Sequence, residues 1–382
     1  MLKNKQKPNS SILQIRSLNM FMDSSRNSII ANLAIFSLLF AGLLYICLWS
    51  TPSSTLLISS LHHSNNKCRT SEFRNIKFPI DELEMVLEKA ATPNKTVVIA
   101  VVNKAYVEQG INSETTMFDL FIESFWVGEE TRPLIKHLLV VAADQTAYER
   151  CMFKRLNCYK LTTDGVDFGR EALYMSPAFI KMMWRRTLLL LDVLKHGYNF
   201  IFTDTDVMWL RNPFPRLSKN GTDDLQISTD VFFGNNIDDG KQLINTGFYF
   251  MRSNNKTIAL LDKWYGMKDN STGKKEQDVL LDLLRGGFFK QLGLQTLFLD
   301  TQYFSGFCQD SKDVRAVVTV HANCCRSIKA KVQDLSAVLR DWKRFKAVAA
   351  AEKSKLSAIA RTFQWTGHFG CWNSWGPSNN TN

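Results

Sequence analysis

The chain has 382 residues, of which 45% are hydrophobic and 12% aromatic, so it carries enough apolar material for a large folded core. Its formal net charge of +11 is spread along the sequence, and no known nucleic-acid-binding motif accompanies it, which argues against a nucleic-acid-binding protein. A basic surface of this kind suits anionic nucleotides or acidic polysaccharides.

An uncharged apolar run occupies residues 29–49. Its length is about the 20 residues that a helix needs to cross a bilayer. The preceding residues 1–28 carry five basic side chains against one acidic one, so the positive-inside rule keeps that end in the cytosol. We therefore expect a single-pass type II membrane anchor, followed by a Ser- and Asn-rich stem at residues 50–77. A cleaved signal peptide and a buried core helix are the alternatives.

The residues after the expected anchor have features that are typical of proteins in an oxidising, lumenal compartment. They contain five Asn-x-Ser/Thr sequons and seven of the eight cysteines. No pair of cysteines has the CxxC spacing of a zinc site, so structural disulfides are expected, with one cysteine left free or in an intermolecular bond. A homodimer through Cys68 or the stem is compatible with this count.

Helices and apolar runs alternate in the next part of the chain. Residues 81–91 form an amphipathic helical pattern, and the continuous apolar runs 96–102 and 137–142 are typical of strands covered on both faces. A helical stretch at 115–126 separates them. This alternation predicts a parallel sheet built from βαβ units.

A long helix is predicted over residues 176–197. Ser176 can cap its start, Pro177 suits the first turn, and Gly197 ends it. The helix leads directly into the next strand. Its basic side chains Lys181, Arg185 and Arg186 would lie beside any site at the end of that strand, although we expect at least two of the three on a solvated face.

The apolar strand that begins at Phe200 ends in two carboxylates, Asp204 and Asp206. Positions i and i+2 of a strand face the same way, so the two side chains can converge on one cation. Carboxylate oxygens favour hard divalent ions, which are the usual partners of phosphate groups. The pattern therefore indicates diphosphate chemistry, with a helix cap or a solvated turn as the alternative for an isolated Asp-x-Asp.

Two further motifs follow. Residues 245–247 (Asn-Thr-Gly) are expected to form a turn before an apolar strand, where Gly247 would let a ligand approach the backbone and Asn245 could donate to a sugar hydroxyl. Gln277 and Asp278 lie at the start of a helical pattern; the alternative is that such acids only complement the helix dipole.

A strand at residues 317–321 ends in His321. An imidazole at the end of a strand could complete a metal site that two carboxylates begin. A lone histidine is more often structural, and His368, in an aromatic-rich tail, is the competing candidate.

Together these segments resemble a known family. The sequences FIFTDTDVMWLRNPF, INTGFYFMRS, EQDVL and VHANCCRSIKAKVQDL, in this order, are similar to the plant nucleotide-diphospho-sugar transferases of glycosyltransferase family 77. The resemblance covers residues 97–345. It implies a retaining GT-A enzyme whose Rossmann-like α/β domain, with a mixed, mainly parallel sheet, spans residues 78–345 and is followed by a tail at 346–382. It also implies a type II membrane protein of the Golgi whose catalytic domain is lumenal. Residues 363–375 match no part of the family pattern.

The resemblance also implies a metal site and a donor site. Asp204 and Asp206 match the family's DxD motif, and His321 matches the histidine that completes a Mn²⁺ site, with Mg²⁺ as the alternative ion. Asn245 and Gly247 match positions that touch the acceptor or the donor sugar.

The same resemblance gives roles to two residues near the reacting carbon. Gln277 and Asp278 match the pair beside the anomeric carbon, where Gln277 would stabilise an oxocarbenium-like state and Asp278 is the candidate nucleophile of a double displacement; front-face attack stays open. Asn103 and Asp144 are chosen from the residues themselves: like Asp204 and Asp206 they fall at the ends of expected strands, where ligands of parallel sheets bind, so they would hold the nucleoside. Lys181, on the helix beside the site, would contact ribose or phosphate.

The expected activity is the transfer of arabinose, xylose or galactose from a UDP-sugar to a cell-wall polysaccharide or a glycoprotein. Two other classes are compatible with the sequence. One is a catalytically silent Golgi scaffold that keeps the fold, and the other is a glycan-binding protein without nucleotide affinity.

Overall fold

The computed structural model describes residues 81–108, 115–163, 168–172, 175–217, 221–237, 240–351 and 363–376. The expected cytosolic tail, membrane anchor and stem lie outside these residues, as does Cys68. Among the described helices, none is both long enough and apolar enough to cross a membrane.

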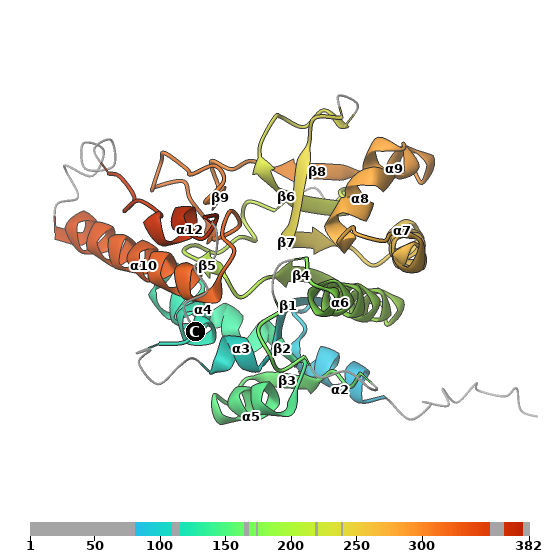
Figure 1. Ribbon diagram of the computed structural model, residues 1–382, viewed down its shortest axis with the longest axis horizontal. Coiled ribbons are helices and arrows are strands. Elements are labelled where there is room, and N and C mark those ends of the chain that lie inside the picture. Colours follow the sequence, from blue (N-terminus) through green and yellow to red (C-terminus); the bar gives the residue numbers. More distant parts are fainter. Residues whose placement is uncertain are drawn as a thin grey trace, which may run out of the picture. The chain divides into compact units, whose positions relative to one another are not determined.

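The centre of the described structure is a seven-stranded sheet of mixed, mainly parallel strands (Figure 1). All neighbouring strands run parallel except at β7, which is antiparallel to β4 on one side and to β6 on the other. The predicted sheet type is therefore confirmed. In spatial order the strands are β3 (Asn157–Lys160), β2 (Leu138–Ala142), β1 (Thr96–Val102), β4 (Asn199–Thr203), β7 (Leu243–Met251), β6 (Leu225–Val231) and β8 (Thr296–Leu299).

Helices cover both faces of this sheet, as the continuous apolar strands require. Along β1, Val98 and Ala100 belong to one buried cluster, and Val97 and Ile99 to the other, because successive strand residues point to opposite faces. The helices of the first face are α3 (Lys104–Val107), α4 (Met117–Val127), α5 (Gln145–Phe153) and α10 (Ile328–Ala351). Those of the second face are α2 (Glu82–Ala90), α6 (Pro177–Lys195), α7 (Asn255–Gly266), α8 (Glu276–Arg285) and α9 (Phe288–Gln291).

The predicted helix starts are confirmed by their caps. The carboxylate of Asp81 accepts from the backbone N–H of Glu84 at the start of α2, and Thr116 and Asp119 form a capping box at the start of α4. The hydroxyl of Ser176 caps α6 by accepting from the N–H of Phe179. Two short 3₁₀ helices lie in connecting segments of the described chain: Arg132–His137 between α4 and β2, and Lys268–Asn270 between α7 and α8.

The expected turn at residues 245–247 is wrong, because this segment lies inside β7. Strand β7 pairs with β6 through Tyr249 and again through Asn245, and the register shifts between these two pairs. The Asn and Gly that suggested a turn instead mark an irregularity within a strand, where glycine also permits close approach by another group.

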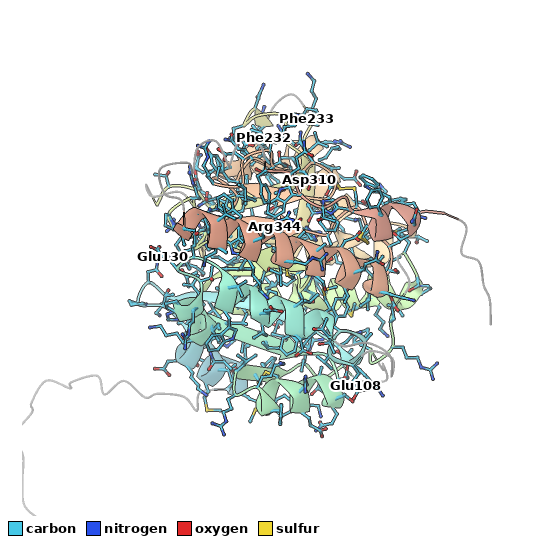
Figure 2. All side chains as sticks on the ribbon, turned by 90° about the vertical axis from the view of Figure 1, so that its left-hand side faces the viewer. Glu108, Glu130, Phe232, Phe233, Asp310 and Arg344 are labelled. Atoms are coloured by element: carbon cyan, nitrogen blue, oxygen red, sulfur yellow. A yellow bond between two sulfur atoms is a disulfide. The ribbon has the colours of Figure 1, made fainter. Side chains whose placement is uncertain are left out.

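A smaller sheet and the last helices pack beside the first face. The small sheet has the order β5 (Val207–Trp209), β10 (Thr319–His321) and β9 (Phe304–Gly306). Helix α10 lies along α4 and carries Arg344 on its outer face (Figure 2). The expected boundary between a domain ending at 345 and a tail starting at 346 falls inside α10.

Three disulfides among the described residues confirm the prediction of structural disulfide bonds. The bonds are Cys151–Cys158, Cys308–Cys324 and Cys325–Cys371. The last of these ties α12 (Phe369–Asn373) to the segment between β10 and α10. The two adjacent cysteines 324 and 325 therefore serve two different bonds.

Candidate active site

A cavity of about 170 Å³ opens at the edge of the main sheet where β1 and β4 end. Because β7 runs in the opposite direction, its first half reaches the same edge. The N-terminus of α8, the middle of α6 and the start of α10 close the cavity. Its polar lining is formed by Asn103, Tyr106, Glu171, Arg186, Asp204, Thr205, Asp206, Asn245, Thr246, Lys275, Glu276, Gln277, His321, Asn323, Arg326 and Lys331.

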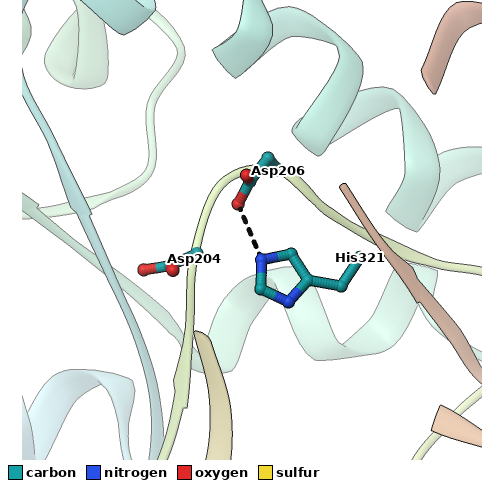
Figure 3. A group of neighbouring side chains, drawn as sticks. All are labelled: Asp204, Asp206 and His321. Atoms are coloured by element: carbon teal, nitrogen blue, oxygen red, sulfur yellow. Dashed lines mark ion pairs between the residues drawn. The ribbon is translucent and has the colours of Figure 1, made fainter. Parts of the chain in front are cut away.

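Three of the predicted metal ligands meet in this cavity. Asp204 and Asp206 follow β4, and His321 ends β10; each offers a ligand atom, and these atoms lie within 4.8 Å of one another (Figure 3). Nε2 of His321 lies 3.4 Å from Oδ1 of Asp206. Two carboxylates and an imidazole form a donor set that suits a divalent transition metal. His368, the competing histidine, lies elsewhere and pairs with Asp310 at 3.0 Å.

Gly247 keeps the space between these ligands open. Its carbonyl accepts from the N–H of Asp204 at 2.7 Å, so the strand passes directly behind the group. A Cβ added at this position would collide with Cε1 of His321 and would lie 2.9 Å from Oδ2 of Asp204. Any larger residue at position 247 would fill the point where the ligand atoms converge. Because glycine leaves this point open, the residues present fit a divalent ion there.

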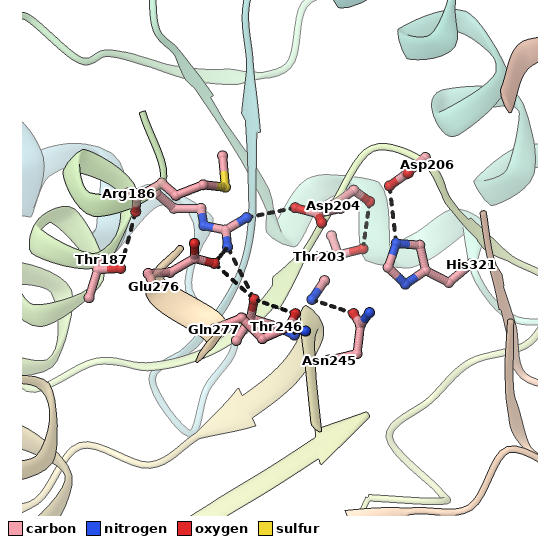
Figure 4. Close-up of polar contacts among 12 residues, drawn as sticks. Arg186, Thr187, Thr203, Asp204, Asp206, Asn245, Thr246, Glu276, Gln277 and His321 are labelled. Carbon is pink, nitrogen blue, oxygen red and sulfur yellow. Dashed lines mark hydrogen bonds and ion pairs between the residues drawn. The ribbon is translucent and has the colours of Figure 1, made fainter. Parts of the chain in front are cut away.

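A buried guanidinium holds one side of the group. Arg186 of α6 donates to Oδ1 of Asp204 at 2.9 Å and to Oε1 of Glu276 at 2.6 Å (Figure 4). Its guanidinium carbon also lies 4.5 Å from the centre of the Phe202 ring. Burial disfavours the charged guanidinium, but the carboxylates of Asp204 and Glu276 outweigh this effect and raise the pKa of Arg186.

A second cation faces the other carboxylate. Nζ of Lys331, on the first turn of α10, lies 2.6 Å from Oδ2 of Asp206. Burial alone would raise the pKa of Asp206, but Lys331 and His321 hold it well below its usual value. Burial raises the pKa of Asp204, against the opposing effect of Arg186, and raises that of nearby Tyr106 to about 12. The lowered pKa favours the negatively charged carboxylate of Asp206, which is the form that binds a cation.

The other predicted residues inside the cavity are Asn103, Asn245, Gly247 and Gln277. Nδ2 of Asn103 donates to the carbonyl of Phe168 at 2.7 Å, while its buried Oδ1 has no hydrogen-bond partner. Oε1 of Gln277 accepts from the N–H of Thr246 at 3.0 Å, which fixes the amide and leaves its NH₂ group for a ligand.

The structure does not bring Asp144, Lys181 or Asp278 to the cavity lining. Asp144 caps α5 and accepts from the N–H of Lys104 at 2.6 Å. Lys181 is exposed on α6. The carboxylate of Asp278 accepts from the N–H of Lys275 at 3.2 Å, as a helix-capping acid does.

Sequence reasoning assigned no role to Glu276 or Lys331, and it placed Arg186 beside the site only as one of three basic residues on the same helix. The position of Arg186 carried a signal, because it lies three residues after buried Met183 and four before buried Leu190 on the inward stripe of α6. Glu276 is 2% exposed, and its Oε2 has no hydrogen-bond partner. No local pattern indicated that Lys331 would reach Asp206, since 125 residues separate them in the sequence.

The comparisons with known proteins identify the family. A family model described as nucleotide-diphospho-sugar transferase matches residues 133–335. The chain belongs to this family. It is a glycosyltransferase of the nucleotide-sugar type, and its resemblance to plant members of glycosyltransferase family 77 is confirmed.

This transferase is similar to several proteins along much of its length. An uncharacterized protein of Arabidopsis thaliana is 54% identical over 91% of this chain and 96% of its own. The beta-arabinofuranosyltransferase RAY1 of the same plant is 29% identical over 63% of this chain and 45% of its own. Among solved structures, the galactosyltransferase LgtC with donor and acceptor sugar analogues aligns with a TM-score of 0.37 and 13% identity, over 59% of this chain and 86% of that one.

Replacing Gly247 with alanine is expected to weaken or abolish binding of a divalent ion by the Asp204, Asp206 and His321 group, because the new Cβ would displace the His321 imidazole. Gly266→Ala is the matched control: it lies in α7, and nothing approaches within 4 Å of its added Cβ. Calorimetric titration with Mn²⁺ measures both. Equal Mn²⁺ affinity in the two variants would contradict the metal site.

Replacing Arg186 with leucine is expected to lower the free energy of unfolding by about 3–5 kcal/mol, because two carboxylates would lose their buried partner. Arg185→Leu changes the next residue, which bonds to Thr163 and to the carbonyl of Thr162 at the surface, and should cost about 1 kcal/mol or less. Urea denaturation followed by circular dichroism compares the two. Similar decreases in the free energy of unfolding would show that the ion pairs of Arg186 stabilise the fold no more than the surface hydrogen bonds of Arg185 do.

Proposed function

We propose that the protein transfers a sugar from a UDP-sugar to a hydroxyl group of a glycan acceptor, with retention of the anomeric configuration and with a divalent ion bound by Asp204, Asp206 and His321. The observation that carries this proposal is the convergence of those three side chains around Gly247, at the strand ends where ligands of α/β sheets bind. Because the donor set includes an imidazole, Mn²⁺ is favoured over Mg²⁺. A bound divalent ion would supply positive charge for the departing diphosphate.

The residues around this group suit the other parts of a nucleotide sugar. Lys331 places an ammonium on the cavity lining, where it can pair with phosphate oxygens. The buried Oδ1 of Asn103, which lacks a partner, can accept the N–H of a uracil ring. Asp144 and Lys181 are separated from the cavity lining, so Asn103 and Lys331 are better candidates for the nucleoside and phosphate roles.

The sugar would lie between β7 and the start of α8. Thr246 donates to Gln277, and its hydroxyl lies 3.0 Å from Oε1 of Glu276, so these side chains are held in place before a donor arrives. The NH₂ group of Gln277 can then support the sugar ring as positive charge develops at the anomeric carbon. Retention by double displacement needs a carboxylate nucleophile, whereas front-face attack needs none.

The sugars proposed for the donor are arabinose, xylose and galactose, since curated relatives are named arabinosyl-, xylosyl- and galactosyltransferases. The proposed acceptor is a cell-wall polysaccharide or a glycoprotein. The apolar run at 29–49 and the sequons after it support a type II protein of the Golgi membrane with its catalytic domain in the lumen.

The first test is donor turnover by the full chain, purified in detergent from a secretory host. We expect UDP release from UDP-arabinose, UDP-xylose or UDP-galactose in Mn²⁺, and loss of this release in EDTA and in Asp206→Asn. Turnover that survives in Asp206→Asn would refute the metal assignment. UDP binding without turnover of any sugar would favour the silent scaffold, and the absence of UDP binding would remove the donor site altogether.

The role of the pair at the start of α8 has its own test. Gln277→Ala should lower kcat by about 10²-fold, as the loss of a positioned donor does, with little change in the KM for the donor. Asp278→Asn should leave kcat close to that of the unaltered chain, because its carboxylate caps α8. A comparable loss of kcat in Asp278→Asn would instead support Asp278 as the nucleophile.

A further inference from the structure

Three large aromatic side chains stand exposed on the short segment that carries α12. Phe369, Trp372 and Trp375 are 60%, 55% and 49% exposed; the first two lie one turn apart on α12, and Trp375 follows just after the helix ends. The rings of Phe369 and Trp372 meet edge to face with centroids 5.2 Å apart. We call these three side chains the aromatic platform. Contiguous exposed aromatic surface of this kind marks a binding site more often than chance exposure does.

The platform is held rigidly. The disulfide Cys325–Cys371 anchors its helix, and the buried carboxylate of Asp334 accepts the N–H groups of Gly370 and Cys371 at 3.2 and 2.7 Å. The indole N–H of Trp375 donates to the carbonyl of Cys324 at 3.0 Å. A ligand that stacks on these rings therefore binds with little loss of conformational entropy in the protein.

The platform is continuous with the rim of the active-site cavity. Cys325 and Arg326 both line the cavity. The guanidinium of Arg326 lies 3.8 Å from the centre of the Trp375 ring, and its backbone N–H donates to the hydroxyl of Ser374 at 3.0 Å. A chain that enters the cavity beside Arg326 can thus continue over the three rings.

We propose that the aromatic platform binds the sugar rings of the acceptor glycan that follow the one receiving the transferred sugar. A sugar ring has a C–H face that is apolar and can stack on an aromatic ring while its hydroxyls stay in water, which matches rings that are half exposed. The platform adjoins the cavity on the side of Arg326, whereas the metal group and Asn103 would engage the donor. This inference rests on the proposed function and names the acceptor as an oligosaccharide of several residues.

The experiment compares Trp372→Ala with Trp126→Ala in the full chain. Trp126 is a matched control, because it is 53% exposed, has the guanidinium of Arg132 4.4 Å from its ring, and does not line the active-site cavity. The probe is an array of plant cell-wall oligosaccharides, one to eight sugars long, with pectic, xylan, arabinan and arabinogalactan backbones. UDP affinity in Mn²⁺ is measured in parallel by calorimetry.

We expect the unaltered chain to bind at least one oligosaccharide more tightly as its length increases. Trp372→Ala should weaken that binding about tenfold or more, as loss of an aromatic anchor does, while Trp126→Ala should not. If Trp372→Ala and the unaltered chain bind every oligosaccharide equally, or the unaltered chain binds none, the platform proposal is overturned. The parallel measurement separates this result from failure of the proposed function, in which UDP would not bind in Mn²⁺ either.

Discussion

The candidate site depends on one buried contact, the guanidinium of Arg186 between the carboxylates of Asp204 and Glu276. Asp204 belongs to the end of β4 and Glu276 to the start of α8, so the single side chain from α6 fixes the relation of three elements. Glu276 is fully buried, and a buried charge without a partner is costly, so the Glu276 carboxylate depends on this cation more than the partly exposed Asp204 does. Lys331 is the corresponding partner of Asp206 from α10. Two cations thus face three carboxylates at the metal group before any ligand binds, which leaves an excess of negative charge.

The reversed direction of β7 explains how the rest of the cavity is assembled. In a purely parallel sheet, only the carboxyl ends of the strands lie at the edge where ligands bind. Because β7 runs against β4, its beginning reaches that edge and brings Asn245, Thr246 and Gly247 beside Asp204. The irregular pairing of β7 with β6 adjusts where these residues lie. The glycine then leaves room for the imidazole of His321, which arrives from the small sheet.

Sequence reasoning predicted the elements with strong periodicity and failed where distant contacts decide. The bounds of β1 and the cap of α6 followed from local pattern, and Asp204, Asp206 and His321 were found from their positions at strand ends. The Asn-Thr-Gly segment was misassigned because turn composition and a strand irregularity use the same residues. Arg186 was one of three basic residues on a helix, and only packing against β4 and α8 distinguishes it from Arg185. Contacts such as Lys331 with Asp206 depend on the completed fold and leave no local trace.

The disulfide between Cys325 and Cys371 has a consequence for how the protein matures. Cys325 lies on the lining of the cavity, whereas Cys371 belongs to the last described element, after all the strands and every other described helix. This bond cannot form while those elements are still being synthesised, so the rim of the cavity is closed covalently only at a late stage. Completion of the rim thereby depends on oxidation of these two cysteines after both have been synthesised.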